Sequence, residues 1–256
     1  MELSEELKEH FFKGHEKFLR HISIDCVVFG FHENELKALL LKSSIFNKWT
    51  LPGGFVMREE LMDAAAHRIL NERTGLGKIY LQQFHVFSDP LRSEMKSQLG
   101  FLKKVDVTSE KSWMLERFIS VGYTALVDFT KVKPMPDFLS ETCEWFSVPD
   151  IPQLIFDHRL ILEKALDHLR LQLNYQPVGY NLLPLKFTMP ELQALYETVL
   201  DRKLDRRNFH RKIMATGILI KLNETKKGVA HKAPFYYKFD LRKYEKALKA
   251  GMGFQL

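Results

Sequence analysis

The chain contains only two cysteines among its 256 residues, Cys26 and Cys143. Two cysteines are too few for a disulfide framework or for a zinc site of the CxxC type, so we expect both to be buried thiols in a reducing compartment. The sequence also has no apolar run close to the ~20 residues that a membrane-spanning helix needs. The acidic N-terminus lacks the basic region and apolar stretch of a secretory signal. These absences predict a cytoplasmic protein that makes no membrane contact.

The composition is that of a globular protein. Apolar residues make up 45% of the chain and charged residues 27%, which excludes collagen-like, low-complexity and disordered classes. The length exceeds the usual ~100–150 residues of one domain. We therefore expect two domains, each with its own core.

Positive charge is concentrated in the C-terminal third of the chain. Residues 184–256 contain 16 Lys and Arg against 7 Asp and Glu, whereas residues 1–183 contain 22 against 25. A basic segment of domain size beside a nearly neutral one indicates a polyanionic partner for the basic part. The alternative is a solvated basic face with no partner.

Hydrophobic periodicity divides the chain into an N-terminal helix over residues 1–20, a domain over 21–175 and a second domain over 176–256. The junction is placed at 176–184, where two prolines and a glycine interrupt the pattern. Residues 90–116 form a polar stretch that we interpret as an insertion, with Trp113 as an anchor. In the front domain the pattern predicts strands over 22–31, 36–42, 79–87 and 117–129, and helices over 59–74, ended by Gly75, and 154–173.

A chemical motif begins at Gly54 in the front half of the chain. Leu51-Pro-Gly-Gly54 is followed by Glu60, Arg68, Leu70, Glu72, Gly75 and Leu76, at the spacing G-x5-E-x7-R-E-U-x-E-E-x-G-U, where U is aliphatic. This pattern resembles the signature of the Nudix hydrolase family, and seven of its nine fixed positions match. The resemblance implies an α/β/α sandwich over roughly residues 20–170.

The metal-binding positions of this signature are altered. The family holds Mg²⁺ with carboxylates at positions i, i+3 and i+4 of one helical face, and here those positions are Ile69, Glu72 and Arg73. One carboxylate rarely suffices for a hard divalent cation, and an arginine repels it. Without the metal, hydrolysis loses its main electrostatic contribution. We therefore expect no catalytic residue, no metal and no cofactor in this domain.

Two interpretations explain why the rest of the motif remains. In the first, Gly54, Arg68, Glu72 and Gly75 serve the loop, the helix and internal pairing only. In the second, the pocket persists for binding without chemistry, and Arg68, Glu72 and Arg73 contact an effector, since a planar guanidinium can hold an anion or sugar hydroxyls.

The back half begins with a helix-turn-helix pattern. Thr188-Met-Pro-Glu191 is a capping box, and apolar spacing continues a helix over residues 189–200. Asp205 is a good N-cap for a second helix, closed by Gly217, with Phe209, Ile213 and Met214 on its core face. The polar residues near its start suit contacts with phosphates and base edges in a major groove: Arg206, Arg207, Asn208, His210 and Arg211.

Two strand-like segments follow, over residues 218–222 and 235–239. The segment between them is basic and resembles the wing of a winged-helix domain, with Lys226, Lys227 and Lys232 positioned to track DNA phosphates. The alternative is that these lysines only add solubility.

With both halves considered, the chain resembles the Nudix-related transcriptional regulators, in which a Nudix-like domain precedes a winged helix-turn-helix. The resemblance rests on the altered motif, on Ile155-Phe-Asp-His158, on Gly179-Tyr-Asn-Leu-Leu-Pro184, on residues 187–197 and on residues 204–212. It implies a homodimer on a palindromic DNA operator and an effector such as ADP-ribose or a pentose. It also makes Arg117 a candidate effector contact, whereas Phe156, Asp157 and His158 are equally consistent with packing and capping.

The sequence thus favours a ligand-responsive transcription factor over two alternatives. One is a Mg²⁺-dependent hydrolase of a nucleoside diphosphate derivative that assembles its metal site from Glu60, Glu72 and carboxylates elsewhere. The other is a basic winged-helix module used for protein contacts.

Overall fold

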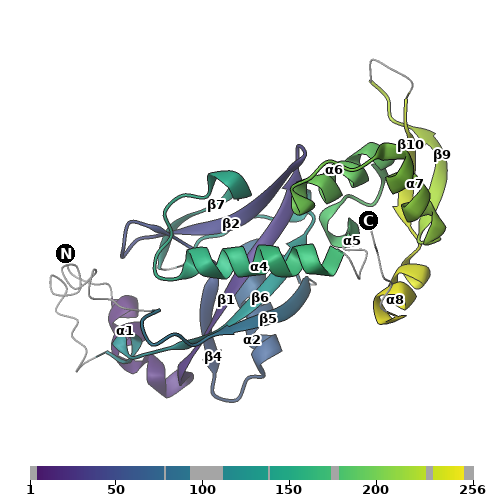
Figure 1. The fold of residues 1–256 in the computed structure, drawn as a ribbon. Helices are drawn as coiled ribbons and strands as arrows, with labels where there is room; N and C mark the ends of the chain where they lie inside the picture. Colours follow the sequence, from purple (N-terminus) through teal and green to yellow (C-terminus); the bar gives the residue numbers. More distant parts are fainter. Residues whose placement is uncertain are drawn as a thin grey trace. The chain divides into compact units, whose positions relative to one another are not determined.

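The computed structural model describes residues 5–77, 79–92, 112–137, 139–173, 179–228 and 233–250. The front part consists of a seven-stranded sheet with associated helices (Figure 1). Its strands are β1 (Phe18–His32), β2 (Glu35–Ser43), β3 (Trp49–Thr50), β4 (Gly53–Met57), β5 (Tyr80–Phe87), β6 (Ile119–Val127) and β7 (Ser140–Ser147). Its helices are α1 (Glu5–Lys17), α2 (Met62–Thr74) and α4 (His158–Leu173), with 3-10 turns at Trp113–Leu115, Phe129–Lys131 and Val148–Asp150.

Strand β1 organises the sheet. The strand order is β3-β2-β1-β6-β5, and β4 and β7 pair with β1 and β2. The antiparallel register of β1 with β4 places Asp25 opposite Gly53 and Ile24 opposite Gly54. The glycine-rich loop of the Nudix-like motif is therefore attached directly to the centre of β1.

Apolar residues of β1 and β2 form the centre of the core. Val27, Val28 and Phe29 are fully buried on β1, as are Leu39 and Leu40 on β2. Continuous burial of this kind is expected for strands that are covered on both faces. Helix α4 crosses in front of the sheet and α2 lies on its far side (Figure 1), which confirms the α/β/α prediction.

Several predicted boundaries were wrong. The N-terminal helix ends at Lys17, and β1 begins at Phe18, earlier than the expected residue 22. The helix expected from residue 154 begins at His158, because Phe156 has a positive φ of 47° that is incompatible with a right-handed helix. Strands β4 and β7 were not predicted. The helix predicted over 59–74 begins only at Met62, but its end at Thr74 is confirmed, and Gly75 caps it with a φ of 70°.

The C-terminal part is a winged helix. It comprises α5 (Gly179–Leu182), β8 (Phe187–Thr188), α6 (Met189–Leu200), α7 (Arg206–Ala215), β9 (Leu219–Thr225), β10 (Phe235–Phe239) and α8 (Leu241–Ala250). The three strands form a separate sheet in the order β8-β10-β9. The bounds of α6 match the prediction, and the first turn has both hydrogen bonds of the capping box. Residues of the predicted junction before Gly179 lie outside the described residues.

Aromatic packing holds the winged helix together. Tyr196 of α6 contacts Phe209 of α7 edge to face, with 5.3 Å between ring centroids. Phe239 lies 4.9 Å from Phe187 and 5.4 Å from Tyr244 of α8. Helix α8 was not predicted, although Tyr244 is almost fully buried and anchors it.

Contacts divide the chain into two compact units. The first contains Met1–Val28, Ala38–Ala125 and Val132–Ala165, and the second contains Phe29–Lys37, Leu126–Lys131 and Leu166–Leu256. Within the second unit, Thr198 Oγ1 donates to the carbonyl of Asn34 at 3.0 Å, and Arg170 Nε donates to the carbonyl of Val199 at 3.0 Å. The β1–β2 turn and the end of α4 thus both contact α6.

No described helix is long and apolar enough to cross a membrane.

Candidate functional site

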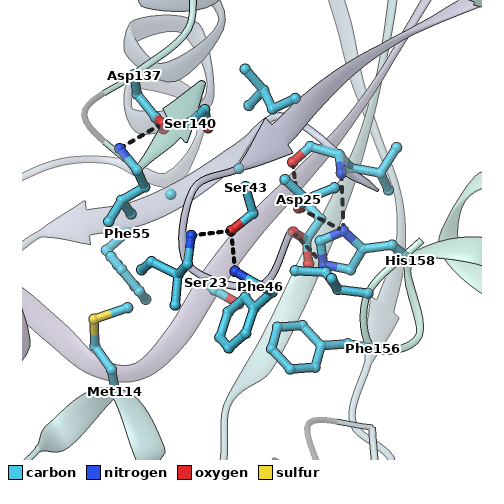
Figure 2. A pocket seen from close by; sticks show the side chains of 18 of the residues that line it. Ser23, Asp25, Ser43, Phe46, Phe55, Met114, Asp137, Ser140, Phe156 and His158 are labelled. Atoms are coloured by element: carbon cyan, nitrogen blue, oxygen red, sulfur yellow. Dashed lines mark hydrogen bonds and ion pairs between the residues drawn. The ribbon is translucent and has the colours of Figure 1, made fainter. Parts of the chain in front are cut away.

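A cavity of about 200 Å³ lies in the first unit, between β1, β2, the glycine loop and the start of α4. Most of its lining is apolar and includes Phe11, Phe55 and Phe118. Thr50 and Arg92 are polar residues of the lining. Figure 2 shows the other polar residues that line the cavity: Ser23, Asp25, Ser43, Asp137, Ser140 and His158. An apolar cavity with a few convergent polar groups is the usual form of a small-molecule site.

Arg92 connects two carboxylates in the cavity wall. Its Nε and Nη2 donate to the two carboxylate oxygens of Asp157 at 2.9 and 3.0 Å. Nη2 also lies 3.3 Å from Asp25 Oδ2, which accepts a further hydrogen bond from Ser120 Oγ at 2.5 Å. The Arg92 and Asp25 side chains are only 5% and 10% exposed, so this ion-pair network is shielded from solvent.

His158 is the other buried titratable group of the cavity. Its Nδ1 accepts a hydrogen bond from the Leu51 backbone N–H at 3.0 Å and lies 3.0 Å from Thr50 Oγ1. The proton of the neutral ring therefore sits on Nε2, which faces Asp25 Oδ1 at 3.6 Å. Burial lowers the pKa of His158, although Asp25 and Asp157 act in the opposite direction. The imidazole is neutral at pH 7.

Two phenylalanines line one side of the cavity. Phe46 and Phe156 are half-buried and contact each other edge to face, with 5.8 Å between centroids, next to His158 (Figure 2). The positive φ of Phe156 is a true outlier for a bulky residue, and such strain is found mainly at functional sites. With this backbone conformation, the Phe156 side chain lines the cavity.

The Nudix-like motif is occupied by internal contacts. Arg68 donates to both Glu60 carboxylate oxygens at 2.9 and 2.8 Å and to the Phe55 carbonyl at 2.9 Å. This pairing lowers the pKa of Glu60. Glu72 is 46% exposed and lies 3.6 Å from Arg68. These contacts give Arg68 and Glu60 a structural role.

The two replaced metal positions are buried in the protein. Ile69 packs against Gly54, where an added Cβ would lie 3.0 Å from Ile69 Cδ1. Arg73 donates to Asp137 Oδ2 at 2.7 Å. Among the described residues, no group of three or more His, Cys, Asp and Glu side chains could hold a metal ion. The residues present do not fit the Mg²⁺ of the Nudix signature.

None of the four predicted effector residues lines the cavity. Arg68 and Glu72 bind within the motif, and Arg73 reaches the cavity only through Asp137. Arg117 is exposed and donates to the Ser88 carbonyl at 2.8 Å.

Sequence reasoning missed Asp25 and Arg92. A signal for Asp25 existed, since a single acid precedes the apolar run of residues 26–29 and a buried charge requires a partner.

Helix α1 closes one end of the cavity. Phe11 lines this end. The last part of the predicted insertion holds α1, since Trp113 Nε1 donates to the His10 carbonyl and Ser112 Oγ donates to the Phe11 carbonyl, both at 2.9 Å. Trp113 is buried, which confirms its predicted role as an anchor. The predicted insertion lies mostly outside the described residues, at 93–111.

The second candidate surface is helix α7. Asp205 caps it by accepting from the Asn208 N–H at 2.8 Å, as predicted. Arg206, Arg207 and His210 are exposed and have no polar partner among the described residues. Arg211 is exposed as well and donates to Asn208 Oδ1 at 2.8 Å. Phe209 and Ile213 are buried as predicted, whereas Met214 is only half-buried.

The wing lysines differ from one another. Lys226 Nζ lies 2.7 Å from Glu191 Oε1, the carboxylate that also completes the capping box of α6. This pair raises the pKa of Lys226. Lys227 is exposed, and Lys232 lies outside the described residues.

Comparison with protein families matches residues 19–169 to the NUDIX domain. The chain belongs to the NUDIX domain family. Residues 179–239 match a second model, the NrtR DNA-binding winged helix domain. The order of the two domains agrees with the resemblance seen in the sequence.

Known proteins share this arrangement. The chain is 29% identical over 232 residues to the ADPR responsive transcriptional repressor NtrR of Acinetobacter baylyi, which spans 88% of this chain and 84% of that protein. It has the fold of Shewanella oneidensis NrtR in complex with a 27mer DNA, with a TM-score of 0.70, 22% identity and coverage of 88% and 96%. A MutT/nudix family protein from Enterococcus faecalis gives a TM-score of 0.63 at 21% identity, with coverage of 93% and 99%.

Proposed function

We propose that the chain is a ligand-responsive transcriptional repressor that binds double-stranded DNA through its winged helix and a small effector through its NUDIX domain. The observation that carries this proposal is the capped helix α7, with exposed Arg206, Arg207 and His210 beside its N-terminus. Long donors of this kind near a helix N-terminus suit phosphates and base edges. The A. baylyi relative, a transcriptional repressor by name, supports the same class.

The effector is proposed to be a sugar or a nucleotide sugar of the ADP-ribose type. A ligand changes DNA affinity only by as much as its affinities for the two states of the protein differ. The β1–β2 turn and the end of α4 both contact α6, while β1 and α4 also carry the cavity residues Asp25 and His158. If ligand binding shifts either β1 or α4, the contacts of that element with α6 of the helix-turn-helix would therefore change.

We propose that the protein acts in the cytoplasm. We also propose that it binds a palindromic operator as a homodimer, since isologous dimers are the commonest assembly and their twofold symmetry matches an inverted repeat. The test is selection of bound duplexes from a random DNA pool at physiological salt, followed by titration of the enriched sequence. We expect an inverted repeat with half-sites one or two helical turns apart, and weaker binding by Arg207→Ala. Enrichment of no sequence, with or without ADP-ribose and pentoses, would refute the proposal.

We further propose that the NUDIX domain does not hydrolyse its ligand, because Ile69 and Arg73 replace two of the three metal-binding carboxylates. The alternative function is a Mg²⁺-dependent hydrolase of a nucleoside diphosphate derivative. Incubation with ADP-ribose and Mg²⁺ distinguishes them. We expect no AMP release above background, whereas turnover that Glu72→Gln abolishes would establish the hydrolase.

A further inference from the structure

The turn between α6 and α7 lacks the glycine that is common in helix-turn-helix motifs. Its residues are Asp201, Arg202, Lys203, Leu204 and Asp205. Asp201 caps α6 in a left-handed conformation, with a φ of 52° and a ψ of 42°. Aspartate tolerates this conformation better than most residues, but glycine adopts it at lower energy. Other interactions must therefore hold the turn in this shape.

The turn gains little from apolar packing. Three of its residues line a cavity of about 470 Å³ beside the end of α6: Asp201, Arg202 and Lys203. All three are exposed, and Leu204 is half-buried. Apolar burial stabilises a segment in proportion to the area that it removes from water, which is small for this turn. Hydrogen bonds must therefore fix its position.

Two side chains of α6 bind both backbone groups of Leu204. Glu197 Oε1 accepts from the Leu204 N–H at 2.9 Å, and Gln193 Nε2 donates to the Leu204 carbonyl at 3.0 Å. The same amide group also donates to Glu197 Oε1 at 2.9 Å, since it carries two hydrogens. Residues 193 and 197 lie one helical turn apart on one face of α6. We call this closed set of hydrogen bonds between Gln193, Glu197 and Leu204 the Leu204 clamp.

Glu197 is the charged member of the Leu204 clamp. Its side chain is 16% exposed, and Lys203 Nζ lies 3.2 Å from its second oxygen, Oε2. The hydrogen bond from the Leu204 N–H is the main cause that lowers the pKa of Glu197, so the carboxylate is ionised at pH 7. A hydrogen bond to a charged acceptor is stronger than one between neutral groups. Glu197 therefore makes the strongest bonds of the clamp.

The clamp ends directly before the residue that starts α7. Asp205 caps this helix by accepting from the Asn208 N–H at 2.8 Å. Because Leu204 precedes Asp205, the clamp sets where α7 begins, while the contact between Tyr196 and Phe209 holds the helix against α6. Contacts with base edges depend on the distance and direction of each donor, whereas the attraction of phosphates depends mainly on charge.

We propose that Glu197 is a positioning residue for DNA recognition, which holds α7 through Leu204 in the orientation that lets its exposed polar side chains reach base edges. The inference rests on the proposed DNA-binding function and adds a residue that acts without touching DNA. Loss of the clamp should lower the affinity for the operator and leave the charge-dependent affinity for other DNA unchanged.

Fluorescence anisotropy titrations of the full chain with the enriched operator and with a random duplex test the proposal. Glu197→Ala should weaken operator binding at least about tenfold, because misplaced donors lose their base contacts. Its affinity for the random duplex should change by less than about threefold, because the cations of α7 remain. Glu245→Ala removes the same charge at an exposed position of α8 and is the matched control, which should bind both duplexes like the wild type.

A conservative variant separates the carboxylate's bond to Leu204 from its charge. Glu197→Gln keeps an oxygen that can accept from the Leu204 N–H, so it should retain operator affinity within about threefold of the wild type. Amide hydrogen exchange gives a second readout, since the Leu204 N–H should exchange faster in Glu197→Ala and not in Glu197→Gln. Gln193→Leu removes two bonds of the clamp and provides the same test if Glu197→Ala does not fold.

Three results would overturn the proposal. The first is an operator affinity that Glu197→Ala leaves unchanged, and the second is an equal loss on operator and random DNA, which indicates a damaged domain. The third is a Glu197→Gln variant that behaves like Glu197→Ala in both readouts. A wild-type protein that selects no operator would instead refute the proposed regulator, and with it the base contacts on which this inference depends.

Discussion

Asp157 receives two hydrogen bonds from Arg92, at 2.9 and 3.0 Å, and this pair brings the start of α4 to the wall of the cavity. The same guanidinium lies 3.3 Å from Asp25 on β1. One buried cation therefore links a helix and a strand that are 132 residues apart in the sequence.

Replacement of Arg92 should lower the free energy of unfolding. Arg92→Met leaves Asp25 and Asp157 without their partner in a site where both are at most 13% exposed, and breaking a buried pair typically costs about 3–5 kcal/mol. Urea unfolding measures the loss. Arg159→Ala removes an exposed pair with Glu163 on α4 and should cost at most about 0.5 kcal/mol. Equal effects of the two variants would contradict the role given to Arg92.

Buried histidine should make the protein sensitive to mild acid. The pKa of His158 is lowered from its ordinary value of 6.5, mainly by burial, so the folded state binds fewer protons than the unfolded state below that pH. The free energy of unfolding should fall as the pH drops below 6.5. His158→Asn keeps an acceptor for the Leu51 N–H and should flatten this dependence, whereas the exposed His67→Asn should not. Identical pH profiles for wild type and His158→Asn would be the contrary result.

Arginines of α7 should dominate DNA affinity. Arg207 is exposed without a polar partner among the described residues, and a bidentate contact to a base is worth about 1–3 kcal/mol. Arg207→Ala should therefore weaken operator binding by about tenfold to a hundredfold in a fluorescence anisotropy titration. Lys164→Ala, on the exposed side of α4, should have no effect. A loss that is equal on operator and random DNA would make Arg207 a phosphate contact.

The docking of α1 depends on the absence of a side chain at residue 14. A Cβ at Gly14 would lie 2.7 Å from the indole of Trp113. Gly14→Ala should therefore loosen α1 even though alanine favours a helix by about 1 kcal/mol over glycine. Limited proteolysis should cut the variant faster near its N-terminus. Gly77→Ala, where an added Cβ meets nothing within 4 Å, is the control.

Elements with strong local signals could be predicted from the sequence. Helices α6 and α7 have their expected starts because Thr188 and Asp205 cap them through residues three positions away. The start of α4 could not be predicted in this way, since Ile155 and Phe156 continue the apolar spacing and only the φ of Phe156 interrupts the helix. Helical periodicity contains no information on such strain.

The cavity could not be derived from the Nudix-like signature. Arg68 and Arg73 have chemistry suited to an anion and Glu72 has chemistry suited to hydroxyl groups, but the fold gives each of them a partner within the protein. Asp25, Phe46, Arg92 and Phe156 meet only through tertiary structure. The side-chain partners of a charged residue depend on contacts distant in sequence, which a motif does not specify.

Glu191 has two roles, as the cap of α6 and as the partner of Lys226 in the wing. A lysine that is paired with a carboxylate attracts other anions only weakly. Lys226 therefore neutralises a DNA phosphate only if its ion pair with Glu191 breaks. The number of condensed cations that DNA releases on binding should then be smaller than the number of basic residues on the surface. Glu191 thus makes the DNA affinity less sensitive to salt than the composition of the domain suggests.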